Sequence, residues 1–422
     1  MSKRNPRKPS PVMPWGDLPR GPRLADTAGG ILIIDKPAGV TSHDIVGAVR
    51  RLAGTRKVGH AGTLDPMATG VLVVGIGQAT KLLTYLVGED KEYASRFRFG
   101  IDTTTEDATG EVTLARGCKD TDAEIDEALR GQTGDIMQVP SSFSAKKVDG
   151  RRAYDMARAG EVVELEAVPI HVSRCERVGN VERSVCEIAV EGDVAGDVAS
   201  VPATTFLEEY TEMDVLVEDA TRNDCVVNSA IEDCYQDVPV SGVPGSDVSV
   251  AGVPVSGVPV ADVSVAIACS SGTYVRAIAR DAGESLGTGA HMTALRRTRV
   301  GAWRAEDAHT VEEYAEKVRA GESLPAIGMA EAASLVMPSH EITPEESANI
   351  RMGRFIEAPR GAFYPMALTC EGELVAVAVG RANKGSAGKK NSTQPTDNNA
   401  EKNTNLLGAK VVFSPHQEIC TS

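Results

Sequence analysis

The chain has 422 residues, a length that fits two or three domains and allows a substantial core. Aromatic residues make up only 4% of it, which argues against long base-stacking surfaces. No run approaches the roughly 18 apolar residues of a membrane span, and residues 1–28 are basic and proline-rich without the apolar core of a signal peptide. We expect these residues to form a disordered tail that either touches polyanions or only aids solubility.

The net charge of −15 is concentrated in one segment. Residues 191–265 hold 15 acidic residues and one basic residue, whereas the rest of the chain is close to neutral. Local basic clusters lie outside this segment: Arg50, Arg51, Arg56 and Lys57; Lys146, Lys147, Arg151 and Arg152; Arg296, Arg297 and Arg299. Because the local field steers a polyanion more than the net charge does, the composition does not exclude RNA as a partner.

The eight cysteines never form a pair separated by two residues, and the seven histidines are scattered along the chain. This spacing indicates neither a zinc site nor a disulfide framework. We therefore expect a reduced, cytoplasmic protein with no bound metal.

The first part of the chain alternates strand and helix patterns. Residues 30–35 read as a strand, and a turn then leads to a helix that ends near Gly54. Thr41 and Asp44 fit a capping box at the start of that helix. The apolar run 71–76 reads as a buried strand. Further helices are expected at residues 122–130 and 153–159.

Residues 191–265 do not continue this alternation of strand and helix patterns, and instead contain recurrent prolines, glycines and acidic side chains. Such a segment opposes a packed core and a central strand, so we interpret it as a low-complexity insertion within a domain spanning 29–305. A connecting helical segment is expected over 306–335. Residues 336–422 then read as a small β-rich module, with strands at 368–379 and 409–413 around a disordered polar loop at 381–405.

The most informative segment is the loop at residues 59–70, GHAGTLDPMATG. Its glycines let the backbone bend and approach a ligand closely, and Pro66 biases Asp65 away from helical geometry. We therefore expect the Asp65 carboxylate to project from a rigid turn that lies just before a buried strand. Taken alone, such a loop is more often only a structural turn.

Other segments change that interpretation. They are residues 34–42 (IDKPAGVTS), 90–93 (DKEY), 138–150 (QVPSSFSAKKVDG) and 269–276 (CSSGTYVR). With the Asp65 loop, and in this order, they closely resemble the TruB-type tRNA pseudouridine-55 synthases of the bacterial stand-alone kind. The resemblance covers roughly residues 30–303 outside the acidic segment. It implies the α+β pseudouridine synthase fold, a mixed and mainly antiparallel sheet flanked by helices, with a small PUA-like C-terminal domain.

The resemblance also implies an activity, the isomerisation of uridine 55 in the T loop of tRNA to pseudouridine. This reaction needs no metal or organic cofactor, because nothing is oxidised or transferred between molecules. The lack of a nucleotide-binding fingerprint agrees, since Gly75 and Gly77 with Lys81 fit neither the dinucleotide nor the P-loop pattern.

By resemblance, Asp65 is the catalytic carboxylate, and it acts either as a nucleophile or as a base that removes a ribose proton. Arg276 matches the arginine that pairs with this aspartate. Tyr93 matches the tyrosine that stacks on the flipped base and helps to move a proton. His60 matches the residue that fills the space near that base, with an ordinary loop histidine as the alternative.

RNA contacts are assigned in the same way. Lys36 either contacts phosphate or holds the Asp65 loop, and we slightly favour the second role. Tyr274 is expected to form a pocket wall. The segment 137–166 corresponds to the part that clamps the T arm, and its basic residues suit phosphate contacts. These residues are Lys146, Lys147, Arg151 and Arg152.

The expected partner is therefore tRNA, bound by a monomer without an obligatory protein partner or a membrane. Two alternatives stay open, an RNA-binding tRNA-folding chaperone with secondary catalysis and a pseudouridine synthase for another RNA. Asp65, Tyr93 and Arg276 together favour catalysis, since a pure binder needs none of them.

Overall fold

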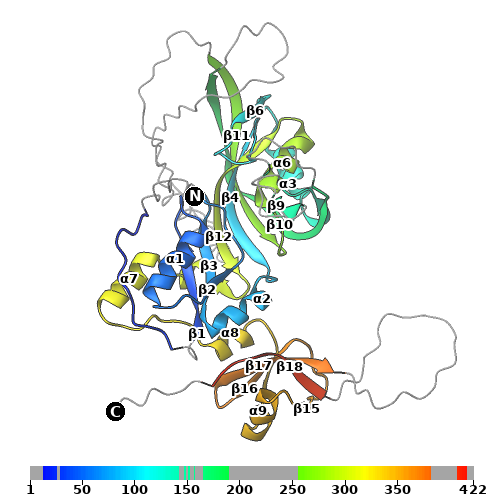
Figure 1. The fold of residues 1–422 in the computed structure, drawn as a ribbon. Coiled ribbons are helices and arrows are strands. Elements are labelled where there is room, and N and C mark those ends of the chain that lie inside the picture. The colour runs from blue at the N-terminus through cyan, green and yellow to red at the C-terminus, as the bar shows by residue number, and fades with distance from the viewer. Residues whose placement is uncertain are drawn as a thin grey trace, which may run out of the picture.

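The computed structural model of the chain describes residues 13–25, 29–141, 147–148, 151–152, 156, 165–189, 255–381 and 406–415. They form a nine-stranded sheet with helices packed against it and, below it in Figure 1, a five-stranded sheet in the C-terminal part. Helices and mainly antiparallel strands follow one another along the chain, as expected for the α+β class.

The nine-stranded sheet is antiparallel except where β3 meets β12. Its main path runs β1 (Gly29–Lys36), β3 (Thr69–Gly77), β12 (Ala290–Val300), β4 (Lys91–Phe99), β11 (Val255–Cys269), β10 (Val168–Ala189) and β7 (Gly134–Gln138). Two short strands extend it, β2 (Val58–Ala61) beside β3 and β13 (Trp303–Arg304) beside β12. Two-stranded pairs are formed by β5 (Ile101–Thr103) with β6 (Val112–Ala115) and by β8 (Lys147–Val148) with β9 (Arg151–Arg152).

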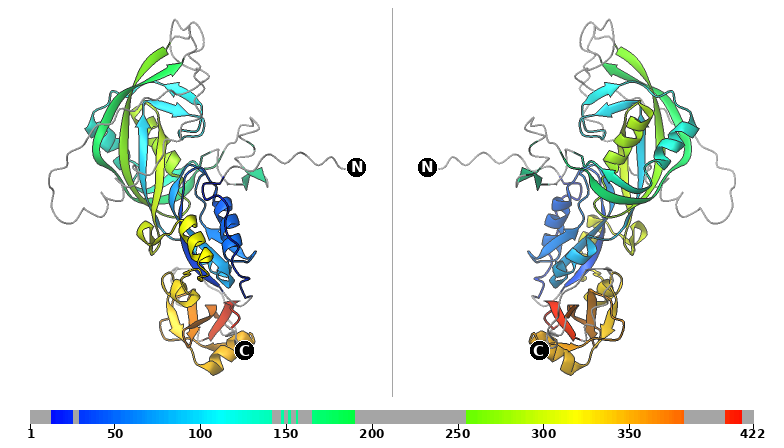
Figure 2. Two further views of the ribbon diagram at one scale, coloured as in Figure 1. Left: turned by 90° about the vertical axis from the view of Figure 1, so that its left-hand side faces the viewer. Right: turned by 90° about the vertical axis from the view of Figure 1, so that its right-hand side faces the viewer.

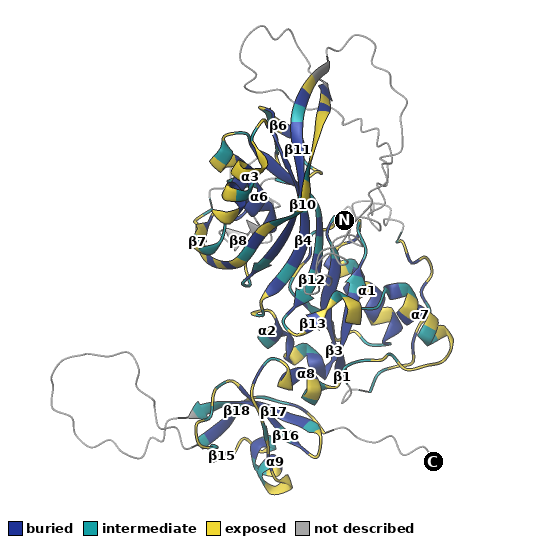
Figure 3. Cartoon of the chain, turned by 180° about the vertical axis from the view of Figure 1, so that it is seen from behind, coloured by how far each residue is buried: buried dark blue, intermediate teal, exposed yellow. Residues whose placement is uncertain are grey.

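Helices cover the two halves of this sheet. Figure 2 shows both halves side-on, with α1 in the half nearer the C-terminal domain and α6 in the far half. The first half packs α1 (Ser42–Leu52) and α7 (Val311–Arg319) on β1 and β3, and the second packs α3 (Asp122–Arg130) and α6 (Val275–Leu286) on β4, β10 and β11. Figure 3 shows that the central strands are mostly buried, whereas the outer faces of α3, α7 and α9 are exposed.

The capping motif and the apolar spacing in the sequence correctly predict the position of α1. Thr41 is its N-cap, and the predicted capping box with Asp44 is present in both directions. Apolar residues recur on one face of the helix, and Ile45, Val49 and Leu52 are buried there. The strand expected at 71–76 is the middle of β3, and the helix at 122–130 is α3, so these predictions are confirmed. The helix expected at 153–159 lies outside the described residues, except for Met156.

The boundary predicted for the acidic insertion is wrong at its C-terminal end. Residues 255–265 belong to β11, which pairs with β10 on one side and, from Ala261 onward, with β4 on the other. Asp262 forms a buried ion pair with Arg98 of β4, with N–O distances of 2.8 and 2.9 Å. Asp262, which the composition groups with the acidic segment, is thus a cross-strand partner in the sheet. Residues 190–254 lie outside the described part of the chain.

The sheet accommodates Pro259 because of where β4 ends. Pro259 lies opposite Val185 of β10, whereas β4 reaches only to Phe99, opposite Ala261. The Pro259 carbonyl accepts a hydrogen bond from the Cys118 backbone N–H at 2.7 Å. The N–H and C=O of one strand residue point to the same side, so the missing N–H of proline removes no bond to β10. The rule against proline in central strands does not apply here, because Pro259 lies past the end of β4, one of the two neighbouring strands.

We predict that replacing residues 190–254 by a short glycine-containing turn leaves a folded protein. Ala189 and Val255 already face each other as the last pair of the β10–β11 ladder, so a tight turn can join them. A longer deletion that also removes residues 255–262 should lower the midpoint of thermal unfolding by many degrees, because it strips β11 and leaves Arg98 buried without its carboxylate. Unfolding of the shorter variant, followed by circular dichroism, would contradict this boundary.

The disordered tail expected over 1–28 is also wrong for residues 13–25. Trp15 and Leu18 are 8% and 5% exposed and pack in the same core as α1. The Arg51 side chain donates to the Leu18 carbonyl, and the Gly21 N–H donates to the Arg51 carbonyl at 3.1 Å. The two apolar side chains, hidden among prolines and cations in the sequence, anchor this segment to the fold. Residues 1–12 and 26–28 lie outside the described part.

The helical connection and β-rich module follow the sequence prediction in outline. Short helical segments η1 (Gln78–Lys81), α2 (Leu83–Leu86) and η2 (Ala305–Asp307) precede α8 (Met329–Ser334). The five-stranded sheet contains β14 (Ser339–Glu341), β15 (Ile356–Glu357), β16 (Met366–Cys370), β17 (Glu373–Arg381) and β18 (Leu406–Val412), with α9 (Pro344–Arg351) beside it. The single strand expected at 368–379 is a hairpin, because Glu371 and Gly372 both have positive φ and form its turn. Residues 382–405, with most of the expected loop, lie outside the described part.

The C-terminal module packs directly on the domain that contains the nine-stranded sheet. Leu82 and Ala333 share one apolar cluster with Leu374, Val377 and Phe413 of the module.

Candidate active site

Asp65 lies in the loop between β2 and β3, and buried neighbours fix that loop. Leu64 and Ala68, on either side of the aspartate, are 4% and 0% exposed and belong to the core. The Ser42 hydroxyl on α1 accepts a hydrogen bond from the Leu64 N–H at 2.9 Å. The Gly39 N–H donates to the Pro66 carbonyl, also at 2.9 Å. The carboxylate is therefore presented from a backbone that is held on both sides.

Lys36, at the end of β1, supports the same loop from below. It is fully buried, and its ammonium donates to the carbonyls of Val40 at 2.7 Å, Pro37 at 2.8 Å and Pro66 at 3.2 Å. Burial lowers the pKa of Lys36 to about 8, although the nearby Asp65 carboxylate opposes this shift. These contacts support the loop-holding role over a phosphate contact.

Arg297 of β12 is a site residue that sequence reasoning missed. Its side chain is 1% exposed and donates from Nε to the Val71 carbonyl at 2.7 Å and from Nη2 to the Gly62 carbonyl at 3.2 Å. Gly70 has φ +97°, and a Cβ added there would lie 2.2 Å from the Arg297 carbonyl oxygen. The glycine thus lets β3 approach β12 closely where Arg297 reaches under the loop.

The arginine cluster at 296–299 is therefore not a free basic surface. Arg296 pairs with both carboxylate oxygens of Asp35 at 2.7 and 3.0 Å, and Arg299 pairs with Glu92 at 2.7 Å. Side chains alternate between the two faces of a strand, so Arg296 and Arg297 point to opposite faces of the sheet. Arg296 pairs with Asp35, Arg297 donates to backbone carbonyls, and Arg299 pairs with Glu92.

Asp65 and Arg276 meet as the resemblance implies. The Arg276 Nε lies 3.0 Å from the Asp65 carboxylate, and the arginine is the second residue of α6. The Arg276 side chain is 6% exposed, whereas that of Asp65 keeps 37% of its surface exposed. Partial burial raises the pKa of Asp65 above its ordinary value, and Arg276 limits the rise by favouring the ionised form.

Asp107 is a second carboxylate that the sequence did not reveal. Its Oδ2 lies 3.5 Å from Nη1 of Arg276, which also donates to the Thr105 carbonyl at 2.9 Å. Its Oδ1 accepts hydrogen bonds from the Thr105 hydroxyl at 2.6 Å and from the Thr109 N–H at 2.9 Å. The guanidinium therefore bridges two carboxylates, one buried and one open. Only a polar turn is visible in the sequence around Asp107, and nothing there indicates a partner 169 positions away.

Tyr93 of β4 lies opposite Arg297 in the sheet and is 9% exposed. Burial raises the pKa of Tyr93 to about 12, although Arg297 opposes this with its charge and a hydrogen bond to the phenol. The hydroxyl therefore carries its proton at neutral pH. The Asp65 charge adds to the rise in the pKa of Tyr93.

His60 lies on β2, just before the Asp65 loop, and Tyr274 lies two residues before Arg276. The His60 ring on β2 contacts His43 edge-on with centroids 5.8 Å apart, and burial followed by the His43 charge lowers the pKa of His60. Tyr274 is the N-cap residue of α6, and its backbone exchanges two hydrogen bonds with the Gln138 side chain. Gln138 thereby fixes the turn that leads into Arg276.

Known proteins resemble this chain over most of its length. A family model described as the TruB family pseudouridylate synthase N-terminal domain matches residues 50–194, and a tRNA pseudouridylate synthase B C-terminal domain model matches 276–332. A protein of Arthrobacter sp. (strain FB24) named tRNA pseudouridine synthase B is 41% identical over 83% of this chain and 89% of its own length. One of the same name from Paenarthrobacter aurescens (strain TC1) is also 41% identical, over 82% and 90%.

The chain belongs to the TruB family of pseudouridylate synthases. Solved structures agree with this at the level of the fold. A Cbf5-Nop10-Gar1 complex contains a chain that matches with a TM-score of 0.53 and 20% identity, over 92% of this chain and 85% of its own. An H/ACA RNP bound to a substrate RNA with 2'-deoxyuridine contains one with a TM-score of 0.52 and 19% identity, over the same shares.

The basic clamp residues of this TruB-family chain are only partly placed. Lys146 lies outside the described residues. Lys147, Arg151 and Arg152 belong to the two-stranded pair β8–β9, of which only the backbone is described. Their contacts with RNA stay a prediction.

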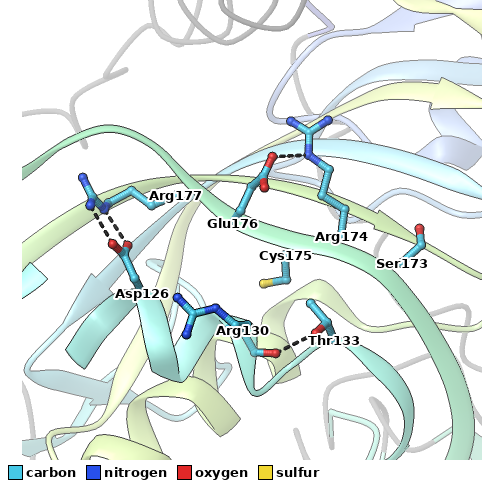
Figure 4. A pocket seen from close by; sticks show the side chains of 8 residues that line it. All are labelled: Asp126, Arg130, Thr133, Ser173, Arg174, Cys175, Glu176 and Arg177. Carbon is cyan, nitrogen blue, oxygen red and sulfur yellow. Dashed lines mark hydrogen bonds and ion pairs between the residues drawn. The ribbon is translucent and has the colours of Figure 1, made fainter. Parts of the chain in front are cut away.

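A cavity of about 380 Å³ between α3 and the edge of β10 does not contain any predicted site residue (Figure 4). Two of its arginines are neutralised locally. Arg177 donates to both carboxylate oxygens of Asp126 at 2.7 Å, and Arg174 donates to Glu176 at 2.7 Å. The cavity is therefore separate from the Asp65 site. Arg177 and Arg174 are both paired with carboxylates, so neither is available to bind an anion there.

The described ranges of the chain carry neither a metal-binding cluster nor a membrane-spanning helix. They contain no group of three or more side chains that would suit a metal ion. Among the helices described, none is both long and apolar enough to cross a bilayer.

Proposed function

We propose that this protein isomerises uridine 55 in the T loop of tRNA to pseudouridine, with Asp65 as the catalytic carboxylate and no cofactor. The observation that carries the proposal is the Asp65–Arg276 pair, 3.0 Å apart, in a half-open site beside the protonated phenol of Tyr93. The names of the bacterial relatives support tRNA as the substrate.

The proposed reaction rearranges bonds within one nucleoside. The N1–C1′ bond breaks, the uracil turns, and C5 forms a new bond to C1′. C5 then loses its proton and N1 gains one, so atoms and electrons balance without an oxidant or a second substrate. Asp65 must be ionised, either to attack the sugar or to remove a ribose proton, and the guanidinium of Arg276 favours that state.

The surrounding groups have supporting roles in this proposal. Tyr93 stacks on the flipped uracil, and its O–H exchanges a proton late in the reaction. Lys36 and Arg297 hold the Asp65 loop through backbone carbonyls, which lets the carboxylate keep its position while the RNA binds. His60 and Tyr274 form walls of the base pocket, and the clamp residues bind the T arm. We also propose that the protein acts as a cytoplasmic monomer without a protein partner.

The experiment uses an unmodified tRNA transcript and the purified protein. Nucleoside analysis should show about one pseudouridine per tRNA, and mapping should place it at position 55. A transcript with cytidine at position 55 should gain none. Modification elsewhere in the tRNA would contradict the assigned position, and modification of another RNA in preference to tRNA would contradict the assigned substrate.

A further inference from the structure

The N-terminal segment and the turn after α1 enclose a second cavity, of about 430 Å³. Its cationic lining is unusual, because four of its side chains are positively charged and none is acidic. The lining residues are Arg20, Gly21, Arg23, Leu24, Gly54, Thr55, Arg56 and Lys57.

Close backbone packing fixes both walls of this cavity. A Cβ added to Gly21 would lie 1.8 Å from the Leu52 carbonyl oxygen, and one added to Gly54 would lie 2.0 Å from that of Pro22. Trp15 anchors the same segment in the core. The cations therefore project from two backbones that are locked together rather than from a loose tail.

These four cations have no anionic partner in the described part of the chain. Arg20, Arg23, Arg56 and Lys57 are exposed, and no described carboxylate lies within ion-pair distance of any of them. The neighbouring Arg51, by contrast, pairs with Asp17 at 3.5 Å. Like charges held together are unfavourable unless an anion compensates them.

The positive charge extends beyond the cavity toward the C-terminal module. Burial and the nearby charge of Lys57 lower the pKa of Lys81. The Lys81 ammonium in turn donates to the Val412 carbonyl of β18 at 2.8 Å. The basic surface thus continues to the contact between the two domains.

The cavity and the Asp65 loop lie near opposite ends of strand β3. Val58, which follows Lys57, pairs with Ile76, whereas the Asp65 loop joins β3 at its opposite end, near Gly70. At about 3.3 Å per residue, these ends of β3 are roughly 20 Å apart. A folded tRNA is longer than this, so one molecule can reach both places.

We propose that this cavity binds a backbone phosphate of the RNA substrate, outside the loop that enters the active site. Arginine and lysine side chains that line one cavity suit a phosphate, which accepts several charge-assisted hydrogen bonds. The proposal rests on the proposed function, since it takes tRNA as the substrate.

The test is the double variant Arg56→Gln with Lys57→Gln, compared with Arg116→Gln with Lys119→Gln. The second pair removes the same charge from exposed positions beside β6. Affinity for the tRNA transcript is measured by filter binding over a range of salt concentrations. We expect the first variant to bind about tenfold more weakly near 0.1 M salt, with a shallower dependence of log K on log salt by about one to two. The loss should appear in KM.

The control variant should bind within twofold of wild type and keep its activity. An unchanged affinity and salt dependence of the first variant, or an equal loss in the control, would overturn the phosphate site. Circular dichroism shows whether each variant is folded, and Arg20→Gln with Arg23→Gln provides a second test from the opposite wall. Wild-type protein that forms no pseudouridine would overturn the proposed function, whereas the binding data would still decide the phosphate site.

Discussion

Replacing Asp65 by asparagine is expected to abolish pseudouridine formation, with a rate loss of at least about a thousandfold. The amide has the shape of the carboxylate and can still accept a hydrogen bond from Arg276, but it is neither a nucleophile nor a base at neutral pH. RNA affinity should stay within severalfold, because contacts with phosphates supply most of it. Single-turnover assays with nucleoside analysis measure the rate, and filter binding measures the affinity.

Asp126→Asn is a matched control for this substitution. Asp126 is also partly exposed, at 31%, and also pairs with an arginine, Arg177, at 2.7 Å, but it lies on α3 outside the site. The control should retain activity within about twofold. Appreciable turnover by the Asp65→Asn protein would show that the carboxylate does not take part in the chemistry.

Replacing Arg276 by lysine should lower the rate at saturating RNA by about a hundredfold, although the charge is kept. The guanidinium contacts Asp65 at 3.0 Å, Asp107 at 3.5 Å and the Thr105 carbonyl at 2.9 Å in three directions. A single ammonium on a flexible stem cannot hold all three. The substitution should leave Asp107 poorly compensated and Asp65 free to turn away.

The pH dependence of the rate distinguishes this role from a purely structural one. Arg276 favours the ionised form of Asp65, so moving the charge away should raise the pKa of that carboxyl further. The acid limb of the pH–rate profile should therefore shift to higher pH in the lysine variant. Arg177→Lys, in the matched pair with Asp126, should change neither the rate nor the profile. A near wild-type rate for Arg276→Lys would mean that charge alone suffices.

Features with short-range causes could be predicted from the sequence. The capping box of Thr41 with Asp44 starts α1 because both partners lie within one helical turn. Asp65 was identifiable because its glycines and Pro66 shape the loop around it, and because the motif was recognised as a whole. The position of Arg276 beside it rested on that resemblance and not on the local pattern.

Long-range packing decided the rest. Arg297 reaches the site because β12 pairs with β3 and β4, and Asp107 reaches it from the turn between β5 and β6, which bridges to Met292 of β12. Contacts across more than a hundred positions leave no local pattern. Pro259 sits in β11 because β4 ends before it, and Trp15 is buried because α1 offers an apolar face. The sequence by itself determined where the chain turns, where helices begin and which carboxylate stands on the exposed loop. Only the tertiary structure decided which charges face one another, because burial and pairing depend on neighbours that are distant along the chain.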